Sequence, residues 1–288
     1  MKTAIMTDTN SGITVQKGKE DGIFVLPMPV IVDDKDYLEG IDITHAKLYD
    51  AMRQGKDIHS SQPALGAVGD MWKDILNHGY DELVYIPMSS GLSGSCHSAM
   101  AYAESFNGKV HVIDNHRISL SLYESVYDAK AYANKGETAV NIKKHLEEKA
   151  YDASIYITVN SLDYLKKSGR VTSAAATIAT VINLKPVLTI QGEKLDAYAK
   201  VRGMNNAKQK MIDAIKHDLE TRFKDYPSDK LIVGTAGTFE KSEDADAWLK
   251  LIDESFPQYE SFYLPLSCSI ACHVGIDSVG TAIVVKDR

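Results

Sequence analysis

Cysteine is scarce in this sequence: Cys96, Cys268 and Cys272 are the only three among 288 residues. An odd number so widely spaced does not form a disulfide framework, which argues against a small secreted domain. Long apolar runs are also missing, so no stretch is typical of a membrane span. At the amino terminus, Asp8 interrupts the apolar run that a signal peptide would need. We therefore expect a cytoplasmic protein.

An excess of positive charge is likewise absent, since 32 Lys and Arg stand against 39 Asp and Glu, a formal net charge of −7. A mildly acidic surface argues against a protein whose main task is to grip nucleic acid or an anionic membrane. We expect no nucleic-acid partner and only transient membrane contact. The hydrophobic fraction of 44% and the charged fraction of 25% are those of an ordinary globular protein.

The amino-terminal half alternates short apolar runs with segments whose apolar residues recur at helical spacing. Strands are predicted at 4–6, 23–32, 82–88 and 109–114, and helices at 44–54, 65–76, 95–106 and 120–133. Strands and helices that alternate at this spacing predict a parallel α/β sheet.

The carboxyl-terminal half has a different order of elements. Strands are predicted at 154–159, 186–190, 194–200, 231–235, 259–264 and 281–285, and helices at 162–167, 205–223 and 242–256. The strands at 186–190 and 194–200 are close enough for a hairpin, which indicates some antiparallel pairing. We therefore predict two α/β domains, 1–150 and 151–288, of which the second has a mixed sheet.

The segment 88–95 (Met-Ser-Ser-Gly-Leu-Ser-Gly-Ser) stands between a predicted strand and a predicted helix. Its glycines allow a tight turn, and its hydroxyls stand beside the free N–H groups of a helix start, which favours an anion. A nucleophile elbow would need Gly two residues after Ser93, where Ser95 stands instead. No Gly-Lys-Ser/Thr follows, so the segment is not a Walker A loop. A structural turn with a helix cap is the alternative.

A second serine-bearing segment is 59–63 (His-Ser-Ser-Gln-Pro), in which Pro63 is placed to open the next helix. The simpler alternative is that Ser60 or Ser61 is the N-cap of that helix and has no other role. A binding role is favoured because the same arrangement occurs twice: in 59–63 and in 88–95 a serine-bearing helix start follows an extended apolar segment. In an open α/β sheet such loops converge on one crevice.

Two further segments carry basic residues or cysteines. Arg170 follows a helix end at Gly169 and could join Arg202 in a basic patch suited to a phosphate or an acidic partner. In 267–275 the spacing is Cys-x-x-x-Cys-His, which is not the haem-attachment spacing. Zinc would need further ligands at matching spacing, so we predict no metal and interpret the cysteines as buried hydrophobes. His273, in a predicted turn of small residues, could donate a hydrogen bond to a carboxylate.

Taken in order, these segments resemble the DegV family of bacterial fatty-acid-binding proteins. The resemblance rests on residues 7–9, 60–63, 89–94, 112–114, 164–170, 184–188, 200–203 and 273–275. Each segment is weak alone, but the ordered set is specific and extends over nearly the whole chain.

The resemblance implies a two-domain α/β protein that holds one long-chain fatty acid, such as palmitate or oleate, in a buried tunnel between the domains. It implies that Ser61 and Ser93 hydrogen-bond the carboxylate, with His273 nearby. It further implies an acyl-carrying subunit of fatty acid kinase, whose partner phosphorylates the bound carboxylate and feeds lipid metabolism. Arg170 and Arg202 stand at positions expected to face that partner or the acyl phosphate. On this reading the protein is a lipid-binding carrier without a cofactor.

Two other functions are compatible with the residues. A serine-dependent acyl hydrolase would use Ser93 with His273 or His97. A binder of a phosphosugar or a dihydroxyacetone-like compound would place its ligand on the loop 91–94. Turnover of a nitrophenyl ester, or displacement of lipid by phosphate, would distinguish them from a fatty-acid carrier.

Overall fold

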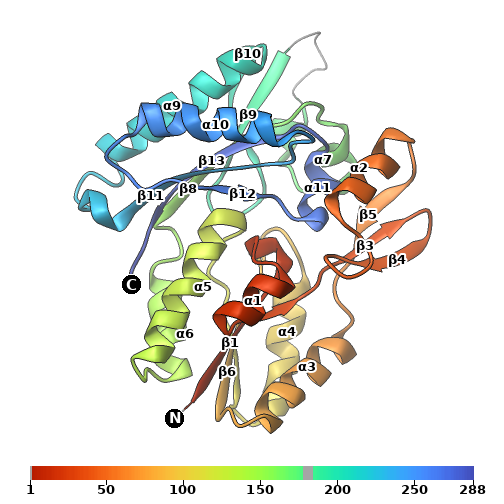
Figure 1. Cartoon of the computed structure of the whole chain (residues 1–288), viewed down its shortest axis with the longest axis vertical. Coiled ribbons are helices and arrows are strands. Elements are labelled where there is room, and N and C mark those ends of the chain that lie inside the picture. Colours follow the sequence, from red (N-terminus) through yellow and green to blue (C-terminus); the bar gives the residue numbers. More distant parts are fainter. Residues whose placement is uncertain (1, 178–183) are drawn as a thin grey trace.

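The computed structural model describes residues 2–177 and 184–288 (Figure 1). Across these residues the strands form three sheets, of four, six and three strands. In Figure 1 the six-stranded sheet and its helices occupy the upper part, the four-stranded sheet the lower part, and the three-stranded sheet one side. This arrangement confirms the predicted α/β class, with a parallel sheet in the first half and a mixed sheet in the second.

The four-stranded sheet is entirely parallel and carries helices on both faces. Its strands, in spatial order, are β2 (Phe24–Leu26), β1 (Thr3–Asp8), β6 (Glu82–Ile86) and β7 (Val110–Val112). One face packs on α1 (Val15–Asp21), α5 (Ser119–Asn134) and α6 (Ala139–Glu148); the other packs on α3 (Leu65–Asn77) and α4 (Ser95–Ala103). Burial on both faces explains why these strands are continuous apolar runs without alternation.

A small antiparallel sheet stands beside the parallel one. It consists of β4 (Lys35–Leu38), β3 (Pro29–Val32) and β5 (Ile58–Ser60), with α2 (His45–Arg53) between β4 and β5. The prediction of one extended strand over 23–32 is wrong, because β2 and β3 belong to different sheets. Pro27 and Pro29 lack the N–H groups that would continue one ladder, and between them the N–H of Met28 donates to the Thr9 hydroxyl at 3.2 Å.

The six-stranded sheet is mixed, as predicted. Its strands, in spatial order, are β10 (Asp196–Arg202), β9 (Leu184–Ile190), β8 (Ala153–Thr158), β13 (Val279–Val285), β11 (Leu231–Gly237) and β12 (Tyr263–Pro265). β11 and β12 are parallel, and the other neighbours are antiparallel. α9 (Met204–Glu220) and α10 (Ser242–Ser255) cover one face of the sheet, with Trp248 fully buried there. The other face is turned toward the four-stranded sheet.

Helix α5 connects the two large sheets. It packs against both β1 and β13, and its buried carboxylates Glu124 and Asp128 accept hydrogen bonds from the carboxyl-terminal Arg288 at 2.6 and 3.1 Å. One apolar cluster contains Val84 of β6 and Leu188 of β9. The chain passes from α6 to β8 at residues 149–152, close to the predicted domain boundary.

Several short elements complete the chain. They are the 3-10 turns η1 (Thr9–Ser11), η2 (Glu104–Phe106) and η3 (Ser228–Lys230), and the helices α7 (Asp163–Ser168), α8 (Ser173–Ala176) and α11 (Cys268–Val274). The pattern of apolar residues in the sequence does not predict α1, α6 or α11. α11 is buried nearly all round, so it shows no amphipathic period. His273 therefore lies in a helix, and its predicted place in a turn is wrong.

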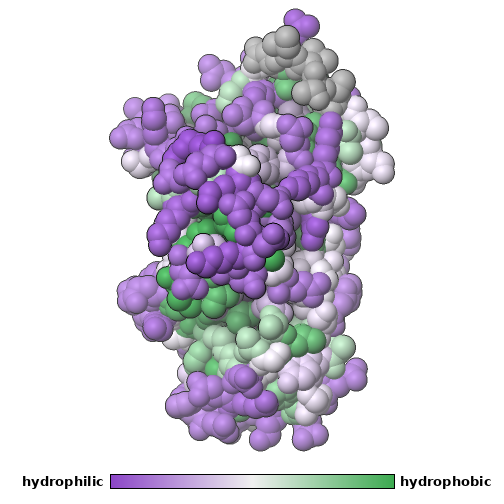
Figure 2. All heavy atoms as spheres, turned by 90° about the vertical axis from the view of Figure 1, so that its right-hand side faces the viewer, coloured by the Kyte–Doolittle hydropathy of each residue, from purple (hydrophilic) through white to green (hydrophobic). Residues whose placement is uncertain are grey.

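Hydrophilic residues cover much of the face seen in Figure 2, the side that carries α2 and the three-stranded sheet, with hydrophobic residues gathered around its middle height. Within the described ranges, 2–177 and 184–288, none of the helices combines the length and the apolar character that a membrane crossing requires.

Candidate functional site: a cavity between the sheets

A cavity with about 990 Å³ of space free of protein atoms, its open mouth included, lies against the inner face of the six-stranded sheet. Strands β8, β9, β11 and β13 supply one wall, and the loops that follow β5, β6 and β7 supply the opposite wall. Helix α11, Leu165 of α7, Arg170 just after α7 and the first residues of α5 supply further lining.

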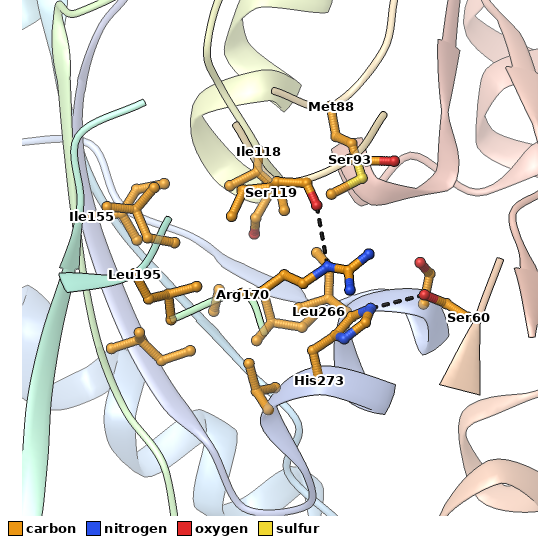
Figure 3. A pocket seen from close by; sticks show the side chains of 18 of the residues that line it. Ser60, Met88, Ser93, Ile118, Ser119, Ile155, Arg170, Leu195, Leu266 and His273 are labelled. Carbon is orange, nitrogen blue, oxygen red and sulfur yellow. Dashed lines mark hydrogen bonds between the residues drawn. The ribbon is translucent and has the colours of Figure 1, made fainter. Parts of the chain in front are cut away.

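The lining divides by chemistry. Apolar side chains of the sheet and its hairpin turn form the strand wall: Ile155, Ile157, Ile190, Leu195, Ala236 and Ala282. Polar side chains from the loops and from α11 gather on the other side: Ser60, Ser61, Ser93, Ser119, Arg170 and His273. Figure 3 shows Arg170, His273 and Ser60 on one side of the cavity and Ile155 and Leu195 on the other.

Two aspartates at the ends of neighbouring strands hold the serine-rich loop after β6. Asp8 at the end of β1 accepts the N–H of Met88 at 3.1 Å, and Asp114 after β7 accepts the N–H of Ser90 at 3.2 Å. Because β6 lies between β1 and β7, the loop is fixed from both sides. Burial raises the pKa of Asp8 to about 6. Asp8 and Asp114 thus hold the loop in place by hydrogen bonds, and neither residue lines the cavity itself.

Ser93 lies on the cavity wall just before α4. Its hydroxyl donates to the Ser95 hydroxyl at 2.9 Å and accepts the N–H of Ser95 at 3.2 Å. Ser93 thus provides part of the predicted helix-capping role while its side chain still lines the cavity. No hydrogen bond to an imidazole is found for it in the described part of the chain, so its surroundings do not match a serine hydrolase nucleophile.

Ser60 and Ser61 lie at the end of β5, and both line the cavity. Helix α3 begins at Leu65 with Ala64 as its N-cap and without a side-chain cap. The prediction that Pro63 opens this helix is therefore wrong, and so is the N-cap role for the two serines. The Ser61 hydroxyl makes no hydrogen bond to any residue that the structure describes, which leaves it available to a ligand.

His273 is held by Ser60 and lacks a second partner. Its Nε2 lies 2.8 Å from the Ser60 hydroxyl (Figure 3), while its buried Nδ1 has no hydrogen-bond partner among the described residues. Burial, together with the charge of Arg170, lowers the pKa of His273 to about 4. The imidazole is therefore neutral at physiological pH and can donate one hydrogen bond without adding charge.

Arg170 points into the cavity (Figure 3). Its side chain donates to the carbonyl of Leu92 at 3.4 Å and to that of Ser168. In the described segments no carboxylate lies within ion-pair distance of Arg170. A half-buried guanidinium without a counter-charge favours the binding of an anion in an otherwise apolar site.

Arg202 does not join Arg170. The N–H of Leu195, just before β10, donates to the Arg170 carbonyl at 3.0 Å, whereas Arg202 ends β10 and pairs with Leu184. Seven residues of extended strand separate these two points, about 20 Å at the rise of a strand. Arg202 is exposed on the edge strand of the sheet. The predicted single basic patch is therefore wrong, because the two cations belong to different surfaces.

Ser119 is a lining residue that the sequence motifs did not indicate. It begins α5 with φ 53°, in the left-handed region that non-glycine residues seldom adopt. Its buried hydroxyl has no partner in the described part of the chain. No glycine or capping motif in the sequence indicates Ser119. Its hydroxyl reaches the cavity because of the backbone conformation at the start of α5.

The profile of a family described as "Uncharacterised protein, DegV family" matches residues 2–286. A DegV domain-containing protein of Deinococcus radiodurans is 32% identical over 218 residues, which cover 75% of this chain and 76% of that protein.

Solved structures share the fold. A fatty-acid-binding DegV family protein of Thermus thermophilus superimposes with a TM-score of 0.88 at 24% identity, covering 99% of this chain and 100% of that one. A stearic-acid-binding protein of Eubacterium ventriosum gives 0.86 at 22% identity, covering 99% and 98%. With a profile that matches almost from end to end and a shared fold, the chain belongs to the DegV family.

Proposed function

We propose that this protein binds one long-chain fatty acid, with the alkyl chain along the apolar strand wall and the carboxylate among Ser61, Ser93 and His273. The observation that carries this proposal is the unpaired polar cluster in an otherwise apolar cavity. Arg170 lacks a counter-charge, and His273 Nδ1 and the Ser119 hydroxyl are buried without partners in the described residues. A carboxylate can accept hydrogen bonds from each of these kinds of group, a guanidinium, an imidazole N–H and a hydroxyl.

The alkyl chain supplies the affinity. Burial of about fifteen methylenes at about 0.8 kcal/mol each contributes about 12 kcal/mol before costs. Association and ordering then remove several kcal/mol. The polar end needs only to avoid leaving a carboxylate buried and unpaired, which serine hydroxyls, a neutral imidazole and one guanidinium accomplish without a metal.

A carrier role follows from the same arrangement. In this proposal the carboxylate end lies among the loops and the acyl chain lies against the sheet, so the head group is the part that a partner can approach. We infer that a fatty acid kinase phosphorylates the bound carboxylate, that Arg170 stabilises the acyl phosphate, and that exposed Arg202 contacts the kinase. The protein acts in the cytoplasm and meets membranes transiently to exchange palmitate, oleate or similar acids.

We further propose that residues 1–150 and 151–288 form two domains with the fatty-acid tunnel between them, which suits this role. The loops of the first unit supply most of the hydroxyls, and the strands of the second supply most of the apolar wall. A tunnel between two units can open by a small relative movement and still exclude water when closed.

Native mass spectrometry of the purified protein tests the proposal. We expect a mass increment equal to one long-chain fatty acid, which gas chromatography of the extracted lipid identifies. Protein stripped of lipid should regain that increment with palmitate or oleate. A protein that purifies empty and ignores both acids contradicts the proposal, and release of nitrophenol from a nitrophenyl ester would support a hydrolase instead.

A further inference from the structure

A second polar cluster lies on the far side of the segment 265–268 from the fatty-acid cavity. It borders a separate hollow with about 560 Å³ of space free of protein atoms, mouth included. Leu266 lines the first cavity, while Ser267 and Cys268 line this one. Within the second hollow Glu39, His45 and Cys268 stand together, and the proposed fatty-acid site uses none of them.

Three distant parts of the chain supply these side chains. Glu39 directly follows β4, His45 is the first residue of α2, and Cys268 is the first residue of α11. Glu39 and Cys268 are buried, and His45 is half-buried at the edge of the hollow. The cysteine motif has no partners nearby in sequence, but the fold brings a carboxylate and an imidazole to it.

The spacing of the donor atoms suits a metal ion. One ligand atom of each residue lies within 4.8 Å of the other two. In a tetrahedral zinc site, with bonds of about 2.0–2.3 Å, neighbouring ligand atoms are about 3.6 Å apart. Side-chain movements of about 1 Å would therefore close the site, which lies within the freedom of rotamers beside a hollow.

Hydrogen bonds already orient two of the three side chains. The Thr9 hydroxyl donates to one Glu39 oxygen at 2.7 Å, and the Cys268 N–H donates to the other at 2.6 Å. His45 Nε2 donates to the Leu266 carbonyl at 2.7 Å, which leaves its Nδ1 with a lone pair. Zinc-binding histidines characteristically donate their second N–H to a carbonyl or a carboxylate in this way.

We propose that Glu39, His45 and Cys268 bind one Zn²⁺ ion, with a water molecule from the hollow in the fourth position. Sulfur, nitrogen and oxygen ligands together favour zinc over the hard cations calcium and magnesium. The thiol proton is released to solvent when the zinc–sulfur bond forms.

The site would clamp α11 to the β4–α2 segment. Because α11 also carries His273, zinc should stabilise the polar end of the fatty-acid cavity without touching it. The metal site does not depend on the fatty-acid proposal, since its residues are separate and its occupancy is measured directly.

Cobalt spectroscopy of the whole chain tests this inference. Protein treated with a chelator, then dialysed with a non-thiol reductant, is titrated with Co²⁺ and, in parallel, with Zn²⁺. We expect one metal per chain, tetrahedral d–d bands and a thiolate-to-cobalt charge-transfer band. Cys268→Ser should abolish the charge-transfer band and weaken zinc binding at least tenfold, and His45→Gln should weaken it similarly.

Cys272→Ser is the matched control, since Cys272 is buried one turn later on α11 and lies outside the cluster. It should keep the stoichiometry and the charge-transfer band. Failure to bind one metal, a band that survives Cys268→Ser, or a band lost in Cys272→Ser each overturns the assignment. Circular dichroism verifies that each variant is folded. If Cys268→Ser unfolds, the loss of metal binding in His45→Gln tests the assignment instead, because His45 is only half-buried.

Discussion

The two sides of the cavity are built by opposite means. The polar side takes its groups from loops and one short helix, each held by specific hydrogen bonds such as Ser60 to His273 at 2.8 Å. The apolar side is a sheet face, where residues such as Ile155 and Ile157 need only the right register. The difference separates two tasks: the strands supply non-directional affinity, and the loops fix which end of a ligand is polar.

The largest expected effect comes from removing two serine hydroxyls from the polar side of the cavity. In Ser61→Ala/Ser93→Ala the two hydrogen bonds that we propose to the carboxylate are lost, each worth about 1.5–3 kcal/mol; the Ser93 O–H, which donates to Ser95 in the structure, turns to the ligand when the acid binds. We expect the dissociation constant of a long-chain acid to rise at least a hundredfold, measured by fluorescence competition. Exposed Ser105→Ala is the control and should bind normally. Equal affinity of the double variant and the control would remove both serines from the site.

The second-largest effect is expected from a substitution that reduces the space for the alkyl chain along the apolar strand wall. Gly280 lines the cavity, and a Cβ built there meets its nearest atoms at 3.4 Å or more, so a side chain can be attached there without backbone strain, and we use Gly280→Leu. The new side chain displaces about three methylenes, about 2.4 kcal/mol or roughly fiftyfold for a long acid. Shorter acids should lose less. Gly66→Leu on α3, where nothing lies within 4 Å, is the matched control; identical chain-length profiles would place the tail elsewhere.

The protonation of His273 gives a smaller effect. Burial, with a contribution from Arg170, lowers its pKa to about 4, below about 6.5 in the unfolded chain. Between these values the unfolded state binds more protons, so this group costs stability as the pH falls, on the order of 2 kcal/mol between pH 7 and pH 5. Asp8, whose pKa is raised, acts in the opposite direction.

Comparison with His273→Gln isolates the histidine, because both proteins share Asp8 and the other carboxyl groups. Urea unfolding at pH 7 and pH 5 should show that the wild type loses more stability than the variant. Parallel losses in the two proteins would mean that His273 is protonated in the folded state as readily as in the unfolded state.

The smallest effect concerns the residue that orients the imidazole. Ser60→Ala removes the hydrogen bond to His273 Nε2, about 1 kcal/mol, so we expect affinity for the acid to fall about fivefold. Ser60→Thr keeps the hydroxyl and should restore most of it. Calorimetric titration distinguishes these outcomes, and equal weakening by both substitutions would indicate a packing role instead.

Much of the fold could be predicted from the sequence because the parallel strands are continuous apolar runs and α3 has a clear apolar stripe. The failures have physical causes. α11 shows no period because it is buried nearly all round, and the segment 23–32 shows no break in apolarity where two sheets meet. Ser93 and His273 could be recognised as candidate residues, whereas Ser119 could not, because its exposure to the cavity depends on a left-handed turn.

By itself the sequence determined the class of fold, the order of the elements and the motifs that place hydroxyls after strands, since these depend on local spacing. Only the tertiary structure decided which groups meet. It paired Ser60 with His273, turned Arg170 into the cavity, placed Arg202 on a distant edge strand, and brought Glu39 and His45 to Cys268. These outcomes depend on sheet order and helix packing across up to 229 residues of chain, which no local pattern encodes.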